Sequence, residues 1–207
     1  MGMSFGEFLN GLWHYLNPMQ RNQRLSRSSS AQQPRSSVYT SIPVHPSKNL
    51  EKVIKMENQS NIRVVNKIIV HCSDTYKRMD IDAATIRNWH VLERGWSDIG
   101  YHFVIKHDGT IETGRDLDQD GDIFEEIGAH TYGYNKNSIG VCLVGGKADN
   151  GEPENNFTKD QFESLEAIIN VIKYDYPDTT VHGHREFANK ACPSFDVQKW
   201  LETVDVG

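Results

Sequence analysis

The stretch KIIVHCSD, residues 67–74, decides how the fold is built. Its apolar run predicts a short strand over residues 67–71 that is buried in a sheet. The strand ends at His71 and opens into a polar loop at Ser73 and Asp74. Because loops that follow the strands of α/β folds commonly carry functional residues, His71 is a candidate site residue. A lone histidine at a strand end is more often structural, so this candidate needs partners elsewhere in the chain.

Outward from this strand, the sequence alternates between apolar runs and helical patterns. Asp82 and Gly95 are the start and stop signals of a helix, and Asp108-Gly109 is the turn of a hairpin. The order of elements predicts an α/β fold in which helices flank a central mixed β-sheet. The expected elements are a strand at 67–71, a helix at 82–94, a hairpin at 101–115, a strand at 138–146, a helix from 158 to about 176, a strand at 179–184 and a short helix at about 195–202.

The longest of these helices has a clear start, a clear end and one apolar face. Thr158 and Gln161 have the spacing of a capping box, and Pro177 ends the helix. The residues expected on its buried face are Phe162, Leu165, Ile168, Ile169 and Ile172. With the strands, this face predicts one compact domain over residues 63–207.

Composition narrows the class of protein. Of the 207 residues, 37% are hydrophobic, which allows one sizeable core but not a core along the whole length. The net charge of −6 argues against direct nucleic-acid binding. The three cysteines, Cys72, Cys142 and Cys192, are too few for a disulfide framework and fit a reducing compartment.

Residues 1–62 differ from the rest and are predicted to be an N-terminal extension. Residues 1–60 carry seven Lys/Arg against three Asp/Glu, whereas the remainder carries 15 against 25. Apolar side chains at helical spacing predict a short amphipathic helix at about residues 5–16. It either packs on the domain or on a second copy, or docks to a membrane, a virion component or a partner. The Ser-, Gln-, Arg- and Pro-rich segment that follows predicts a flexible basic linker. The sequence shows no membrane-spanning run and no secretory signal.

A second group of candidate residues lies near the end of the chain, in HGHREFANKACP, residues 182–193. His182 and His184 are two apart on an expected strand and should therefore face the same side. Thiolates and imidazoles are preferred zinc ligands. His71, one of these two histidines and Cys192 would give three protein ligands and leave a fourth position for water, as in catalytic zinc sites. By spacing alone, a buried structural cysteine with surface histidines is equally consistent.

Five stretches, taken together, are similar to one family. They are IIVHCSDT, RNWHVLERGWSDIGYHFVIKHDGTIETGRD, GYNKNSIGVCLVGG, NFTKDQ and NKACPSFD. This set resembles the type-2 N-acetylmuramoyl-L-alanine amidases, which share a fold with the peptidoglycan-recognition proteins. Within that family the likeness is to the small amidase endolysins of short-tailed phages. It covers about residues 68–200, and nothing before residue 62 takes part in it.

The resemblance implies a site and a reaction. It implies Zn²⁺ held by His71, His184 and Cys192, because the ligand histidine of the family lies eight residues before its cysteine. It also implies that Tyr101 and Lys190 assist catalysis and that His130 contacts the substrate. The reaction would be hydrolysis of the amide bond between N-acetylmuramic acid and L-alanine in bacterial peptidoglycan, which causes lysis of the host cell.

The resemblance leaves several functions and partners open. The alternatives are a non-catalytic peptidoglycan-binding module, whose relatives generally lack the ligand cysteine, and a virion-associated wall hydrolase. A second role as an inhibitor of a phage single-subunit RNA polymerase is also raised by the family. We expect the protein to stay in the host cytoplasm until a holin gives it access to the wall. An acidic loop, 116–126, opens like a calcium-binding EF-hand but has Ile127 where a glutamate is required.

Overall fold

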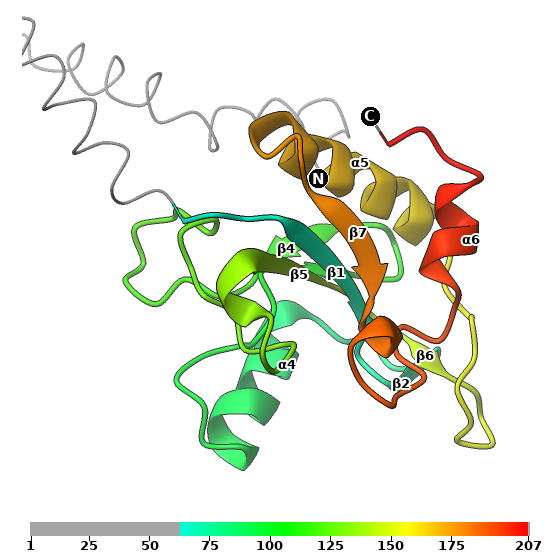
Figure 1. The fold of residues 1–207 in the computed structure, drawn as a ribbon. Helices are drawn as coiled ribbons and strands as arrows, with labels where there is room; N and C mark the ends of the chain where they lie inside the picture. Colours follow the sequence, from blue (N-terminus) through cyan, green and yellow to red (C-terminus); the bar gives the residue numbers. More distant parts are fainter. Residues whose placement is uncertain (1–62, 207) are drawn as a thin grey trace, which may run out of the picture. The chain divides into compact units, whose positions relative to one another are not determined.

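The computed structural model describes residues 63–206 (Figure 1). The predicted helix at about residues 5–16 and the predicted linker lie outside the described residues, so the division of the chain at residue 63 stays a prediction. In the described part, no helix is long and apolar enough to cross a membrane.

The fold is built on a five-stranded mixed sheet, which confirms the predicted class. The strands lie in the order β4-β3-β5-β1-β7. Only the β3/β4 hairpin pairs antiparallel, and the other neighbours run parallel. The strands are β1 (Lys67–Cys72), β3 (Phe103–Ile105), β4 (Ile111–Thr113), β5 (Ser138–Leu143) and β7 (Thr180–Gly183). A separate parallel pair, β2 (Thr75–Tyr76) and β6 (Gly146–Lys147), lies outside the sequence-based prediction.

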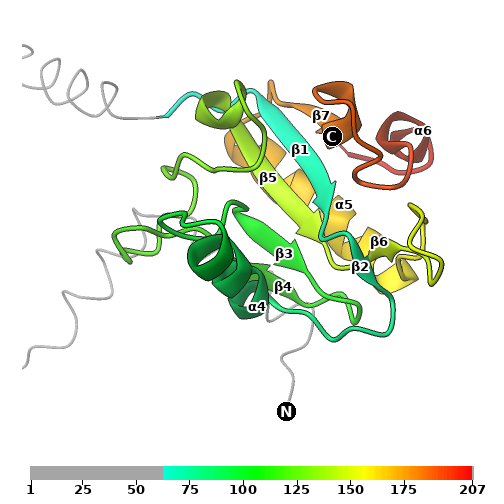
Figure 2. The same cartoon turned by 90° about the horizontal axis from the view of Figure 1, so that it is seen from below.

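Helices cover both faces of the sheet. Helix α5 (Lys159–Asp175) lies on one face, and α4 (Ala83–Asn88) lies on the other (Figures 1 and 2). The predicted capping box is present, since Thr158 and Gln161 bond to each other's backbone N–H. The π-helix η1 (Trp89–Glu93), the 3₁₀ turns η2 (Asn135–Asn137) and η3 (His184–Glu186) and the short helix α6 (Val197–Leu201) complete the elements.

The helix predicted at 82–94 is interrupted. Asp82 caps it as expected, with its carboxylate accepting the N–H of Thr85 at 2.7 Å. At Trp89, however, the α-helix changes into the π-helix η1, which ends before Gly95 at φ +70°. The π turn widens the helix end and brings His90 to a position where its Nδ1 accepts the N–H of Gly100 at 3.0 Å. Part of the candidate site is therefore attached to this wider turn.

The strand predicted at 179–184 ends one residue early, and this corrects the expected placing of two histidines. The carboxylate of Glu186 accepts the N–H of Gly183 at 2.7 Å, which turns the chain into η3 at His184. His182 stays on β7 and bonds to Glu186 at 2.7 Å and to Thr180 at 2.9 Å. His182 and His184 therefore do not share one face of a strand.

The register of the parallel strands brings two distant segments together. Strand β1 lies between β5 and β7, and Val70 is paired with Gly183. The next residue on each strand path is a histidine, His71 after Val70 and His184 after Gly183. Both strands run in the same direction, so their carboxyl ends deliver these two side chains to one edge of the sheet.

Candidate active site

Three potential metal ligands meet at this edge. The ligand atoms of His71, His184 and Cys192 all lie within 4.8 Å of one another. Cys192 Sγ lies 3.8 Å from His71 Nδ1. Tetrahedral zinc with bonds of about 2.3 Å to sulfur and about 2.0 Å to nitrogen requires a separation of roughly 3.6 Å. Donor types and spacing therefore fit a zinc ion held by two imidazoles and a thiolate.

Each ligand is placed by the backbone around it. His71 is 1% exposed at the end of β1, and His184 is 8% exposed at the start of η3. Cys192 lies in the loop that follows η3, and its carbonyl accepts the N–H of Arg185 at 2.8 Å. The N–H of Cys72 points at Cys192 Sγ from 3.3 Å and would favour a thiolate there. The three side chains are thus fixed by the sheet edge and one short loop.

The protonation state of the two histidines suits a cation, whereas that of the cysteine does not. Burial lowers the pKa of His71 well below its usual value, and the nearby His184 and Lys190 add to the shift. Burial and Lys190 also lower the pKa of His184, so both rings are neutral, the form that binds metals. Contact with Cys72 and burial raise the pKa of the Cys192 thiol. A bound metal would therefore have to displace the thiol proton.

His130 and Thr131 contact His71 on the ring nitrogen that faces away from Cys192. His130 Nδ1 lies 3.0 Å from His71 Nε2, and Thr131 Oγ1 lies 3.3 Å from the same atom. Both backbone N–H groups are in turn held by the side chain of Asn135, at 2.9 and 2.8 Å. Because His71 Nδ1 faces Cys192, its Nε2 is free for this contact. The arrangement is typical of the outer residues that orient metal-bound histidines.

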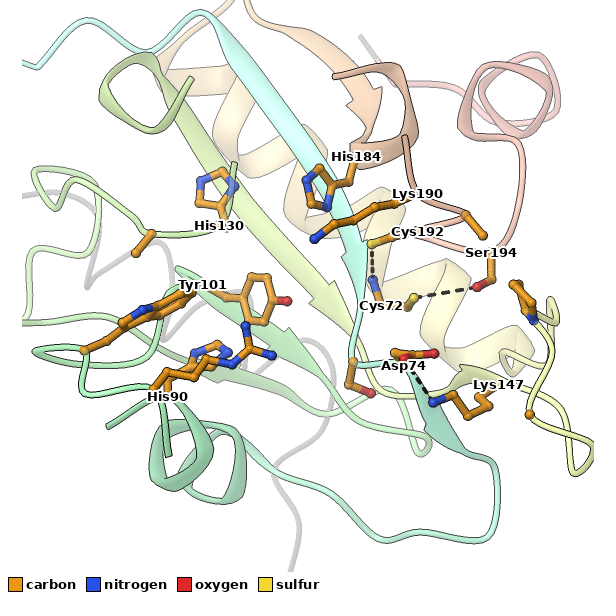
Figure 3. A pocket seen from close by; sticks show the side chains of 17 residues that line it. Cys72, Asp74, His90, Tyr101, His130, Lys147, His184, Lys190, Cys192 and Ser194 are labelled. Atoms are coloured by element: carbon orange, nitrogen blue, oxygen red, sulfur yellow. Dashed lines mark hydrogen bonds and ion pairs between the residues drawn. The ribbon is translucent and has the colours of Figure 1, made fainter. Parts of the chain in front are cut away.

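A pocket of about 560 Å³ lies beside the three ligands, and two of them, His184 and Cys192, line it. Tyr101 and Lys190 project into it from opposite sides (Figure 3). The ring of Tyr101 lies 5.1 Å from that of His71, centroid to centroid. Burial raises the pKa of the Tyr101 hydroxyl well above its usual value, so the hydroxyl keeps its proton. His130 also lines the pocket, as a residue in contact with substrate would, although it is largely buried.

The remaining candidates lie elsewhere. His182 is tied to Glu186 outside the pocket, and Cys142 is fully buried in the core. In the acidic loop, Asp116, Asp118 and Asp120 have carboxylate oxygens within 4.8 Å of one another. Ile127, at the position where an EF-hand needs a glutamate, is half exposed and offers no ligand.

Comparison with known proteins identifies the family. The family model described as N-acetylmuramoyl-L-alanine amidase matches residues 61–195. The chain belongs to this family. The amidase is 46% identical over 141 residues to the endolysin of Enterobacteria phage K11, covering 68% of this chain and 88% of that protein. It is 47% identical over 135 residues to the endolysin of Escherichia phage T7, covering 65% and 84%.

Solved structures agree with this assignment. The amidase superposes on the Endolysine N-acetylmuramoyl-L-alanine amidase LysCS from Clostridium intestinale with a TM-score of 0.57 at 27% identity, covering 71% of this chain and 87% of that one. For Drosophila PGRP-LB the TM-score is 0.51 at 29% identity, with 63% and 75% covered. The predicted likeness to endolysins and peptidoglycan-recognition proteins is confirmed, and the amidase acts on peptidoglycan.

Several residues of the amidase pocket are absent from the sequence-based prediction. Thr131, His90, Arg94 and Trp96 all lie at or beside the site. The signals for the last two were their place around Gly95, the predicted helix stop, and their place inside one of the five stretches shared with the family. Their side chains reach the pocket only because the π turn and the positive φ of Gly95 redirect the backbone.

Proposed function

We propose that this amidase is a zinc enzyme of the endolysin type that cleaves the bond between the lactyl group of N-acetylmuramic acid and L-alanine. His71, His184 and Cys192 would hold the metal. One observation carries the proposal: two neutral imidazoles and a thiol, from segments far apart in sequence, converge beside a pocket that His184 and Cys192 line. A thiolate with two imidazoles favours zinc over harder divalent ions.

The reaction needs a nucleophile, stabilisation of negative charge and a proton for the leaving amine. Zinc, when bound, lowers the pKa of its water towards about 7 and polarises a carbonyl oxygen. The protonated Tyr101 Oη donates a hydrogen bond to the reacting groups, since its ring lies 5.1 Å from that of His71 and lines the pocket. The positive Nζ of Lys190 stabilises the negative charge that develops on the carbonyl oxygen.

The position of His130 supports a role for it in orienting His71, through the contact of 3.0 Å between their ring nitrogens. This role adds to the predicted contact with substrate, which stays a prediction. The presence of all three ligands also favours an enzyme over a non-catalytic binding module, because a binding module has no need of the ligand cysteine.

Mass spectrometry of digested peptidoglycan tests the proposal. The wild-type protein should release stem peptides that begin with a free L-alanine amino group. Cys192→Ser and His184→Ala should release none and should lose zinc, as measured by elemental analysis of the purified proteins. His182→Ala is the matched control and should do both like wild type, because the His182 ring bonds to Thr180 and Glu186 and does not line the pocket. New reducing sugar ends, or tight zinc binding by His184→Ala, would overturn the proposal.

Two other proposed functions depend on sequence alone, polymerase inhibition on the family resemblance and docking on the apolar spacing of residues 5–16. Inhibition of a phage RNA polymerase is tested by transcription with the cognate polymerase in the presence of the full chain. Docking to a virion or membrane is tested by deleting residues 5–16. The deletion should leave hydrolysis of soluble fragments unchanged and should reduce particle or vesicle association. Release by a holin likewise stays an expectation.

A further inference from the structure

Two of the three cysteines of the amidase meet beside the candidate active site, and the proposed reaction uses only one of them. Cys192 is a proposed metal ligand, whereas the side chain of Cys72 has no part in the reaction. Both cysteines line the pocket, and the third, Cys142, does not. All three are free thiols. A thiol that the reaction leaves unused therefore lies next to a ligand thiol, within reach of a molecule that enters the pocket.

Cys72 and Cys192 lie close enough to be joined. The backbone N of Cys72 is 3.3 Å from Cys192 Sγ. Because N and Cα of one residue are about 1.5 Å apart, Cys192 Sγ lies within about 4.8 Å of the Cα of Cys72. The two side chains also contact each other. Disulfides join cysteines whose Cα atoms are about 4.4–6.8 Å apart, and this geometry is compatible with that range.

The surroundings of Cys72 leave its sulfur one redox partner. On one side the sulfur packs against Gly146, where a Cβ would lie only 2.7 Å from it. On the other side Ser194 Oγ lies 3.7 Å from the sulfur and donates to the carbonyl of Gly146 at 2.8 Å. Cys72 is 6% exposed, so the nearest thiol, Cys192, is the group with which it reacts (Figure 3).

Cys142 is unsuited to the same chemistry. It is fully buried on β5, and its Sγ contacts the carbonyl of Leu143 at 3.8 Å. A reagent in the pocket could reach it only by opening the core. Cys142 is therefore an internal control for the reactivity of the other two thiols.

We propose that Cys72 and Cys192 form a redox site that reacts with small disulfides such as glutathione disulfide. In the metal-free amidase, one of the two thiols loses its proton, and its sulfur attacks a sulfur of the reagent. This step releases one glutathione and leaves a mixed disulfide on the protein. The second protein thiol then attacks the protein sulfur of the mixed disulfide and releases the second glutathione. The two protein thiols are oxidised to one disulfide, and the reagent is reduced to two glutathione molecules, which carry the two protons.

The disulfide would prevent metal binding, because a disulfide-bonded Cys192 has no thiolate to offer. Conversely, a metal bound at the candidate site would hold this thiolate and protect it from exchange. Peptidoglycan lies outside the reducing cytoplasm, where disulfides persist. An amidase that reaches it without metal is therefore inactivated reversibly. The inference rests on the proposed function for the role of Cys192 as a ligand.

Mass spectrometry under non-reducing conditions tests this inference on the full-length protein, stripped of metal by a chelator and incubated with glutathione disulfide. Trypsin places the three cysteines in separate peptides, 68–77, 137–147 and 191–199. Wild type should lose two hydrogens as a monomer and give a cross-link between 68–77 and 191–199, with a free thiol in 137–147. Zinc affinity should fall by more than about 100-fold, the upper effect of losing an outer partner alone, and should return on reduction. Protein loaded with zinc beforehand should keep all three thiols.

Two variants assign the cross-link. Cys72→Ala should bind zinc and release stem peptides like wild type before oxidation, but it should form no cross-link and gain at most one glutathione on Cys192. Cys142→Ala is the matched control and should form the same cross-link as wild type, because it removes a thiol that does not line the pocket. The melting temperature of each reduced protein checks that it is folded.

The possible failures are distinguishable. Wild type that gains glutathione but forms no cross-link at any ratio of oxidised to reduced glutathione would overturn the inference. A cross-link that includes Cys142, or oxidation of zinc-loaded protein as fast as of metal-free protein, would also overturn it. Failure of the reduced wild-type protein to bind zinc would instead contradict the proposed function.

Discussion

Replacing His130 with alanine tests how the proposed metal site is held together. His130 is 9% exposed, and its Nδ1 contacts His71 Nε2 at 3.0 Å. Thr131 Oγ1 offers only a longer contact to the same atom, at 3.3 Å. Without His130, the imidazole of His71 should therefore rotate more freely and bind metal less well. Loss of such an outer contact lowers metal affinity by roughly 10- to 100-fold, or about 1.4–2.7 kcal/mol.

The assay is competition for zinc with a chromophoric chelator at constant pH, on protein shown to be folded by circular dichroism. His130→Asn should recover part of the affinity, because its amide oxygen lies near the position of Nδ1. His182→Ala should bind zinc like wild type. Because zinc stabilises only the folded state, the rise in melting temperature on adding zinc should be smaller for His130→Ala than for wild type.

Two results would refute the reasoning in different ways. Zinc affinity within about threefold of wild type would show that His130 does not orient His71. If that result came with a KM raised several-fold and an unchanged kcat, the contact between His130 and substrate predicted from sequence would be the better account.

Three other predictions follow from the structure. Tyr101→Phe should keep zinc and lose about 100-fold in kcat, the usual contribution of a positioned proton donor; an unchanged turnover rate would exclude Tyr101 from the reaction. Thr158→Ala removes the capping box of α5 and should lower the free energy of unfolding by about 1 kcal/mol, measured by urea titration; no loss would mean that packing alone sets the start of the helix. Burial and the charge of Arg63 lower the pKa of His102 to about 3, against 6.5 when unfolded. Below about pH 6.5 the unfolded chain binds the extra proton, so stability should fall by up to about 1.4 kcal/mol per pH unit as the pH decreases towards 3. The urea concentration at the midpoint of unfolding should be lower at pH 5.5 than at pH 7.5. This difference between the two midpoints should be smaller for His102→Gln than for wild type.

The sequence by itself determined the elements and the family. Local periodicity is set by neighbours along the chain, so the apolar run at 67–71, the capping box at Thr158 and the turn at Gly109 are visible without a structure. They predicted a mixed sheet with flanking helices, which is what the chain forms. The shared motifs predicted the amidase family and named the ligand set, because a motif records residue types and spacing.

Tertiary structure decided what depends on segments far apart in the chain. Pairing of Val70 with Gly183 brings His71 beside His184, and no local pattern encodes that register. The carboxylate of Glu186 ends β7 at Gly183, so His182 stays on the strand and His184 lies in the following turn. The contact of His130 with His71 is likewise invisible in sequence, because distance and burial arise only when the sheet edge and its loops pack together.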